Sequence, residues 1–138
     1  MEILLWRHAD AEDGADDMAR RLTPKGEQQA AAMAKWLRAH LPGQYTLLAS
    51  PALRAQQTAS ALGMPITDKS LAPGASVADI TGAAQRHGGL VIIVGHQPDL
   101  GGAAAKLAGA DGEWHVEKGA IVWFAGGWIR AWLSPDLL

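Results

Sequence analysis

Three short, continuous apolar runs constrain the fold of this chain more than any other feature of its sequence. They cover Ile3 to Trp6, Leu47 to Ala49, and Leu90 to Val94. A strand with one solvated face alternates apolar and polar residues, whereas a strand buried on both faces is apolar throughout. The runs therefore predict strands inside a parallel sheet that helices cover on both sides.

Helical patterns fill the segments between these runs. Thr23-Pro24 is a typical helix start, and Ser50-Pro51 reads as an N-cap followed by a first-turn proline. Gly88-Gly89 is a typical stop. We expect four helices, over about residues 24–41, 50–62, 77–86 and 98–109.

The C-terminal segment has a different pattern. Two strand-like runs, Ala120 to Ala125 and Trp128 to Leu133, flank Gly126-Gly127, and two glycines that accept positive φ favour a tight antiparallel hairpin. We predict an α/β fold: a three-layer sandwich with a mainly parallel central sheet and a C-terminal antiparallel hairpin at one edge. With 138 residues and no dividing linker, residues 1–138 are expected to form a single domain.

Composition excludes several classes of function. The chain has no cysteine, which removes disulfides, thiolate catalysis and Cys-ligated metal sites. A net charge of -2 argues against generic binding to nucleic acid or to a membrane surface. The first apolar run is too short for a signal peptide or a membrane span, so we expect a soluble cytoplasmic protein.

Polar motifs follow directly after all three predicted strands. Arg7-His8 follows the first, Ser50-Pro51 with Arg54 follows the second, and Gly95-His96 follows the third. Because ligands bind outside the carboxyl ends of the strands in open α/β sheets, these motifs are expected to form one pocket. Two arginines and a helix N-terminus suit the oxygens of a phosphoryl group, and a neutral histidine is a competent nucleophile toward phosphorus.

Four motifs in order carry a resemblance to a known family. They are Leu5-Trp6-Arg7-His8-Ala9, the Arg20-Arg21-Leu22-Thr23-Pro24-Lys25-Gly26-Glu27-Gln28-Gln29-Ala30 helix start, Ser50-Pro51-Ala52-Leu53-Arg54-Ala55-Gln56-Gln57-Thr58-Ala59, and Val94-Gly95-His96-Gln97-Pro98. Together they resemble the histidine phosphatase superfamily, the phosphoglycerate-mutase-like proteins, from residue 1 to about residue 108. The short chain looks most like the SixA-type phosphohistidine phosphatases.

The resemblance implies a mechanism and a set of site residues. It makes His8 the nucleophile that becomes transiently phosphorylated, before water hydrolyses the phosphoenzyme. It gives Arg7, Arg54 and His96 the role of binding the transferring phosphoryl group, with Arg20 as a weaker candidate for the same pocket. It also implies that the reaction uses no metal and no cofactor.

The sequence departs from the family at the general acid. Members that hydrolyse esters place a glutamate where this chain has Leu71 to Val77, a stretch without an acid. An alkoxide leaving group needs that proton, whereas a protonated imidazole leaves far more readily. Asp10, Glu12 and Asp13 remain possible donors from the acidic loop at residues 10–17.

The expected substrate is therefore a phosphorylated protein. Positions 55–95, between Arg54 and His96, leave little chain for a lid, which suits phosphohistidine on a surface such as a histidine phosphotransfer domain. The alternatives are a phosphatase or mutase for a small phosphate ester and a non-catalytic phosphate-recognition module.

The remaining histidines and the tryptophans are expected to have structural roles. These histidines are His40, His87 and His115, and they belong to no motif. A metal site was also considered, because His8, His96, Asp10 and Asp99 carry suitable donor atoms. Two arginines in the same pocket would repel a divalent cation, which disfavours this alternative.

Overall fold

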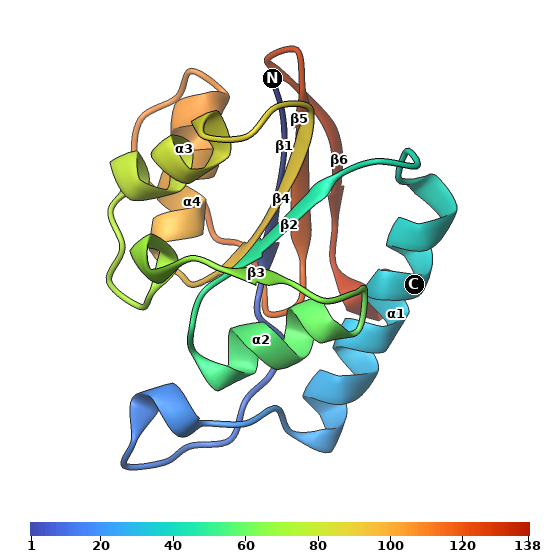
Figure 1. Cartoon of the computed structure of the whole chain (residues 1–138), viewed down its shortest axis with the longest axis vertical. Helices are drawn as coiled ribbons and strands as arrows, with labels where there is room; N and C mark the ends of the chain where they lie inside the picture. The colour runs from blue at the N-terminus through green and yellow to red at the C-terminus, as the bar shows by residue number, and fades with distance from the viewer.

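A computed structural model describes all 138 residues and places one six-stranded sheet at the centre of the molecule (Figure 1). The three apolar runs form β1 (Glu2–Arg7), β2 (Thr46–Ala49) and β4 (Leu90–Gly95). Two more strands form the hairpin, β5 (Ile121–Ala125) and β6 (Trp128–Leu133), and a two-residue strand, β3 (Ile66–Thr67), lies at the other edge of the sheet. The strand order is β3-β2-β4-β1-β5-β6.

The pairing within the sheet is mainly parallel, as predicted. β1 pairs with β4, β4 with β2 and β2 with β3 in parallel, whereas β5 is antiparallel to β1 and β6 to β5. The hairpin turn at Gly126 and Gly127 has φ of 59° and 81°, a conformation that glycine adopts without strain.

Four helices form the outer layers of the predicted sandwich. They are α1 (Pro24–His40), α2 (Leu53–Ser60), α3 (Val77–Gln85) and α4 (Asp99–Leu107), with three short 3-10 turns, η1 (Asp17–Ala19), η2 (Lys69–Leu71) and η3 (Pro135–Leu137). Figure 1 shows α3 and α4 on one face of the sheet and α1 with α2 on the other.

Strand β1 shows why both faces had to be apolar. Ile3 and Leu5 pack into the core cluster that the sheet shares with α3 and α4. Leu4 and Trp6 point the opposite way, into the cluster shared with α1 and α2. A run without polar residues is therefore the pattern of a strand buried in the middle layer. No helix of the structure has the length and apolar character that crossing a membrane requires.

The predicted start of the second helix is wrong by three residues. The helix begins at Leu53, with Ala52 in an extended conformation before it, and Ser50 is not its N-cap. The Ser50 N–H pairs with the Val94 carbonyl of β4 at 3.0 Å, so Ser50 stays with the end of β2. The Ser50 hydroxyl instead accepts a hydrogen bond from the Ala52 N–H at 3.1 Å within the turn.

The first turn of α1 holds the loop that follows His8. Thr23 is its N-cap, and the Thr23 hydroxyl accepts a hydrogen bond from the Gly26 N–H at 2.9 Å. The backbone of Asp10 passes so close that a Cβ at Gly26 would lie 1.9 Å from the Asp10 carbonyl oxygen. Only glycine fits here without moving main-chain atoms.

Replacing Gly26 by alanine is therefore expected to lower the free energy of unfolding by about 1–3 kcal/mol, since the clash is with backbone rather than with a flexible side chain. Urea denaturation measures this loss. Gly63→Ala is the control, because nothing lies within 4 Å of a Cβ at that position. Equal stability of the two variants would contradict the close approach.

Candidate active site

The polar motifs meet at one end of the sheet because three parallel strands end in register. Arg7 lies opposite Gly95 in the β1–β4 ladder. The His8 N–H donates to the Gly95 carbonyl at 3.0 Å, and the Ser50 N–H donates to the Val94 carbonyl at 3.0 Å. The predicted convergence at the carboxyl ends of the strands is therefore present in the fold.

His8 is buried in a form suited to nucleophilic attack. Its Nδ1 lies 2.8 Å from the Ala9 carbonyl oxygen, and a carbonyl can only accept, so Nδ1 carries the proton and Nε2 keeps its lone pair. Burial, together with the charges of Arg54, Arg7 and Arg20, lowers the pKa of His8 from 6.5 to about 4, against the opposing effect of the Ala9 bond. The imidazole is therefore neutral near pH 7.

His96 faces His8 across the same space, with ring centroids 5.2 Å apart. Its Nε2 lies 2.8 Å from the Ser50 hydroxyl oxygen. Burial lowers the pKa of His96 to about 3, and the neighbouring His8 and Arg54 act in the same direction. Ser50 thus orients the second histidine, a role that its place before a proline did not reveal.

Arg54 and Arg20 reach the site from different segments and share one carboxylate. Arg54, 4% exposed, donates from Nη1 to the Asp17 carbonyl at 2.7 Å and from Nη2 to Asp17 Oδ2 at 3.2 Å. Arg20 donates from Nη1 to Asp17 Oδ1 at 3.1 Å and from Nε to the Glu12 carbonyl at 2.8 Å. Bonds from Arg20 and Arg54 lower the pKa of Asp17, which therefore stays ionised between the two guanidinium groups.

Arg7 completes the set from the end of β1. It donates from Nη1 to the Val116 carbonyl at 2.9 Å. The five residues predicted for the site, Arg7, His8, Arg20, Arg54 and His96, thus lie at or beside this end of the sheet: the two histidine rings face each other, and Asp17 links Arg54 with Arg20.

Unpartnered donors indicate what this space suits. Four buried side-chain polar atoms in the chain lack a hydrogen-bond partner, and three of them are Arg7 Nε, Arg54 Nε and His96 Nδ1. Guanidinium nitrogens donate only, so two of these atoms call for acceptor oxygens. Nitrogen donors and positive charge around a neutral histidine suit a phosphoryl group.

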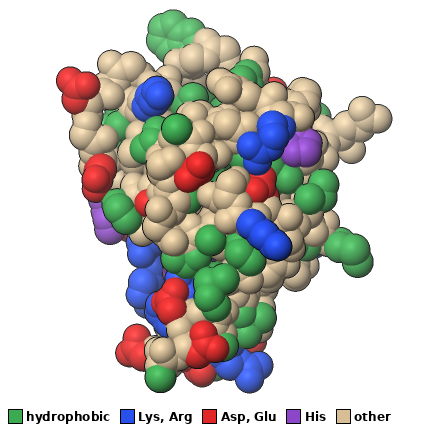
Figure 2. Space-filling model, turned by 60° about the vertical axis from the view of Figure 1, so that its left-hand side comes forward, with side chains coloured by type: hydrophobic (Ala, Val, Ile, Leu, Met, Phe, Trp, Pro, Cys, Tyr) green, Lys and Arg blue, Asp and Glu red, His purple; other side chains and the backbone are tan.

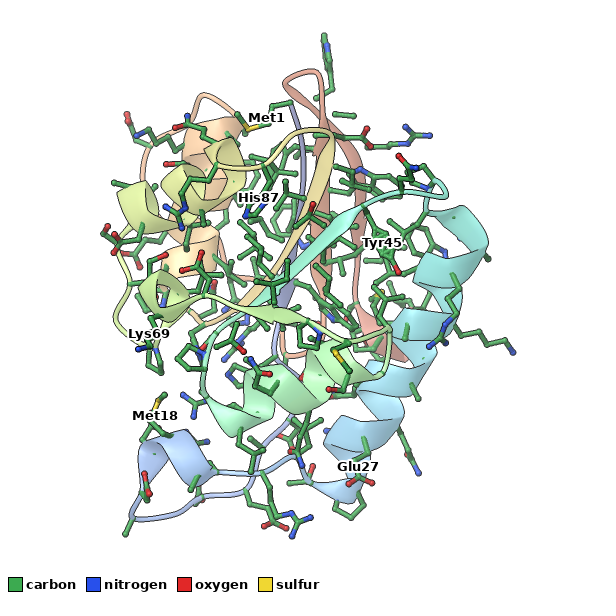
Figure 3. All side chains as sticks on the ribbon, in the orientation of Figure 1. Met1, Met18, Glu27, Tyr45, Lys69 and His87 are labelled. Atoms are coloured by element: carbon green, nitrogen blue, oxygen red, sulfur yellow. The ribbon has the colours of Figure 1, made fainter.

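The loop after His8 is held by residues that sequence reasoning did not single out. The Ala9 N–H donates to the Thr58 hydroxyl at 3.0 Å, and the Asp10 N–H donates to Gln29 Oε1 at 2.9 Å. Figure 3 shows the loop at the lower end of the molecule, with Met18 on η1 at one side and Glu27 in the first turn of α1 at the other. The motif segments that contain Thr58 and Gln29 therefore support the site from outside it.

Of the three possible donors in this loop, Asp10 is engaged elsewhere, whereas the side chains of Glu12 and Asp13 form no ion pair. Asp10 accepts from Lys118 at 2.9 Å and from the Thr23 hydroxyl at 2.8 Å, and these bonds lower its pKa. An ionised, paired carboxylate is a poor proton donor. The four residues weighed as metal ligands, His8, His96, Asp10 and Asp99, form no group of three or more donors arranged to hold a metal ion.

The other histidines lie outside the site, as expected. His40 stacks on Trp36, with ring centroids 4.1 Å apart, and its Nδ1 lies 2.7 Å from the Trp36 carbonyl. His87 follows α3 in a turn, and His115 lies near Trp132 beside a different cavity.

The lowered pKa values of His8 and His96 predict that stability depends on pH. Between about pH 4 and 6.5 the unfolded chain binds more protons at these residues than the folded chain does. Their contribution to stability is complete above pH 6.5 and is lost as the pH falls toward 4. Urea titrations at pH 7.5 and 4.5 give the loss of unfolding free energy between the two pH values. This loss should be smaller in His8→Gln than in the wild type, and unchanged in His87→Gln. An unchanged loss in His8→Gln would contradict the assigned burial.

Comparison with known proteins agrees with this geometry. The family model of the histidine phosphatase superfamily (branch 1) matches residues 3–71. An uncharacterized protein of Picosynechococcus is 34% identical, with 99% of this chain and 92% of that protein covered. The phosphohistidine phosphatase SixA of Escherichia coli is 39% identical over 64 residues, which cover 46% of this chain and 40% of that protein.

A solved structure extends the likeness to the whole fold. The protein histidine phosphatase SixA, complexed with tungstate, superposes with a TM-score of 0.84 at 25% identity and covers 99% of both chains. The fold, the motifs and the two facing histidines agree with the same assignment. The chain is a phosphatase that belongs to the histidine phosphatase superfamily and is of the SixA type.

Proposed function

We propose that this phosphatase removes the phosphoryl group from phosphohistidine on a protein, through a phosphorylated His8 and without a metal ion. In the first step His8 Nε2 forms a bond to phosphorus while the P–N bond of the substrate breaks. The substrate ring is already protonated by solvent on its other nitrogen, so it leaves as neutral imidazole. In the second step water attacks phosphorus, the His8–phosphorus bond breaks and inorganic phosphate is released.

The observation that carries this proposal is the neutral, buried His8 with its free Nε2 among cationic groups. Arg7, Arg54 and His96 would hold the phosphoryl oxygens, and their unpartnered nitrogens support that role. Arg20 would add charge from the loop, where it contacts the carboxylate of Asp17. Fixed positive groups stabilise the charge that develops on these oxygens in the transition state.

The choice of substrate rests on the lack of an acid in the stretch where ester-hydrolysing members of the family place one. The stretch from Leu71 to Val77 runs from η2 into the first residue of α3 and has no acidic residue. Two acids of the loop, Asp10 and Asp17, are ionised in ion pairs. Ester alkoxides need a proton that such groups do not supply, whereas a protonated imidazole leaves readily.

The short connections favour a protein substrate. Between Arg54 and His96 the chain forms the rest of α2, then β3, η2, α3 and β4. None of these elements is an inserted lid over the pocket. A site without a lid suits phosphohistidine on a protein surface. The E. coli relative is named as a phosphohistidine phosphatase, which supports the same substrate class.

Release of inorganic phosphate in EDTA tests the proposal. The substrates would be a phosphohistidine peptide, phosphoserine and phosphotyrosine peptides, and a small sugar phosphate. We expect a strong preference for phosphohistidine and no effect of EDTA. Preference for an ester would favour the alternative of a small-ester phosphatase with an acid in the loop at residues 10–17. Loss of activity in EDTA would contradict metal independence.

A further inference from the structure

A second cavity lies next to the proposed catalytic pocket, between the starts of α3 and α4. It is an open pocket of about 570 Å³, and its lining includes Val77 and Gly102 from the facing helices. Neither catalytic histidine and none of the three site arginines lines it. The cavity is therefore a separate feature of the molecule.

The charges around this cavity lack partners. Asp99, Asp111, Glu113 and Lys106 all line it, and none of the four forms an ion pair. Asp99 is only 9% exposed, and its Oδ2 is the fourth buried polar atom of the chain that has no hydrogen-bond partner. Burial raises the pKa of Asp99, and the charges of Glu113 and Asp79 raise it further.

The unpartnered atom here has the opposite chemistry from those in the catalytic pocket. In the catalytic pocket the atoms without a partner are nitrogens of Arg7, Arg54 and His96, which suit an anion. Asp99 Oδ2 is instead a carboxylate oxygen. A buried carboxylate is costly unless a donor or a cation pairs with it. Three acids and one lysine leave the lining with an excess of negative charge, which favours a cationic ligand.

The cavity is close to the site of phosphoryl transfer. Asp99 comes three residues after His96, and the Leu100 N–H donates to the His96 carbonyl at 3.0 Å, so the two residues share one turn. Their Cα atoms are therefore at most about 11 Å apart. Figure 2, which turns the α3–α4 side forward, shows acidic side chains along the left border and basic side chains gathered below them.

We propose that this cavity binds the guanidinium or ammonium group of an arginine or lysine side chain on the phosphorylated protein substrate. The source of the cation rests on the proposed function, because it requires that the substrate be a protein. One face of the enzyme would then recognise two features of the substrate, a phosphorylated histidine and a nearby cationic side chain. Such pairing of opposite charges gives specificity among partners.

Matched peptides test the proposal kinetically. Phosphohistidine peptides would carry arginine, or its neutral isostere citrulline, at successive positions within about 11 Å of the phosphohistidine. At the best position we expect KM for the arginine peptide to be about tenfold lower, with kcat unchanged, as for a charged hydrogen bond. Asp99→Asn and Glu113→Gln should remove the preference, whereas Glu27→Gln, on α1, should keep it.

The outcomes separate this inference from the proposed function. Hydrolysis of both peptides with equal KM at every position would overturn the cation site and leave phosphohistidine phosphatase activity standing. If neither peptide is hydrolysed, the proposed function is wrong. The protein substrate is then also ruled out as the source of the cation.

Binding without chemistry gives an independent reading. Unphosphorylated arginine peptide should shift the amide resonances of residues 110–113 in the wild type and not in Asp99→Asn. The absence of such shifts would overturn the cavity as a cation site. Equal shifts with free methylguanidinium at the same concentration would show that the cavity binds any small cation, and would contradict a protein side chain as the source of the cation.

Discussion

Replacing His8 by alanine is expected to lower kcat for phosphohistidine hydrolysis by about 10⁴-fold or more, since removal of a covalent nucleophile leaves only the binding groups. His8 has the protonated Nδ1 and the free Nε2 that attack requires. Steady-state phosphate release measures the loss. The thermal midpoint should stay close to that of the wild type or rise, because a buried polar ring is removed.

The matched control is His87→Ala, which removes a histidine from the turn after α3 and should leave kcat unchanged. A folded His8→Ala enzyme that retains wild-type turnover would show that another group attacks phosphorus. His96→Ala tests that possibility, because its ring is the nearest alternative imidazole.

Replacing Arg54 by alanine is expected to lower kcat/KM by about 10²- to 10³-fold, the usual cost of losing one donor to transition-state charge. Its guanidinium is 4% exposed, lies in the first turn of α2 and has an unpartnered Nε. Arg54→Lys should recover part of the rate, because lysine restores charge but not the planar pair of donors.

Arg21→Ala is the control for Arg54, since Arg21 is exposed and its side chain forms no ion pair. It should change kcat/KM by less than about threefold, the scale of exposed charge pairs. An Arg54→Ala enzyme with the rate of Arg21→Ala would remove Arg54 from the proposed catalytic machinery.

The central strands and the meeting of the site residues could be predicted from sequence. Ile3 to Trp6 is apolar at every position because β1 is covered by helices on both faces. Arg7-His8 and Gly95-His96 follow strands that pair in register, so their convergence follows from the direction of parallel strands.

The features that were missed depend on contacts between distant segments. Asp17 lies 37 positions from Arg54, and nothing in a run of acids marks which one will meet a guanidinium. Thr58 holds the Ala9 N–H across 49 positions. Ser50 carries a typical helix-capping signal, but its N–H pairs with Val94 of the neighbouring strand and its hydroxyl contacts His96, and both partners lie more than 40 positions away.

The chemical trapping of the phosphoenzyme tests the account most directly. Enzyme mixed with a labelled phosphohistidine peptide would be quenched in alkali within milliseconds, digested and mapped by mass spectrometry. We expect an acid-labile, alkali-stable phosphoryl group on His8, which is absent from His8→Ala. Turnover with no phosphorylated enzyme at any quench time, or with the label on another residue, would contradict it.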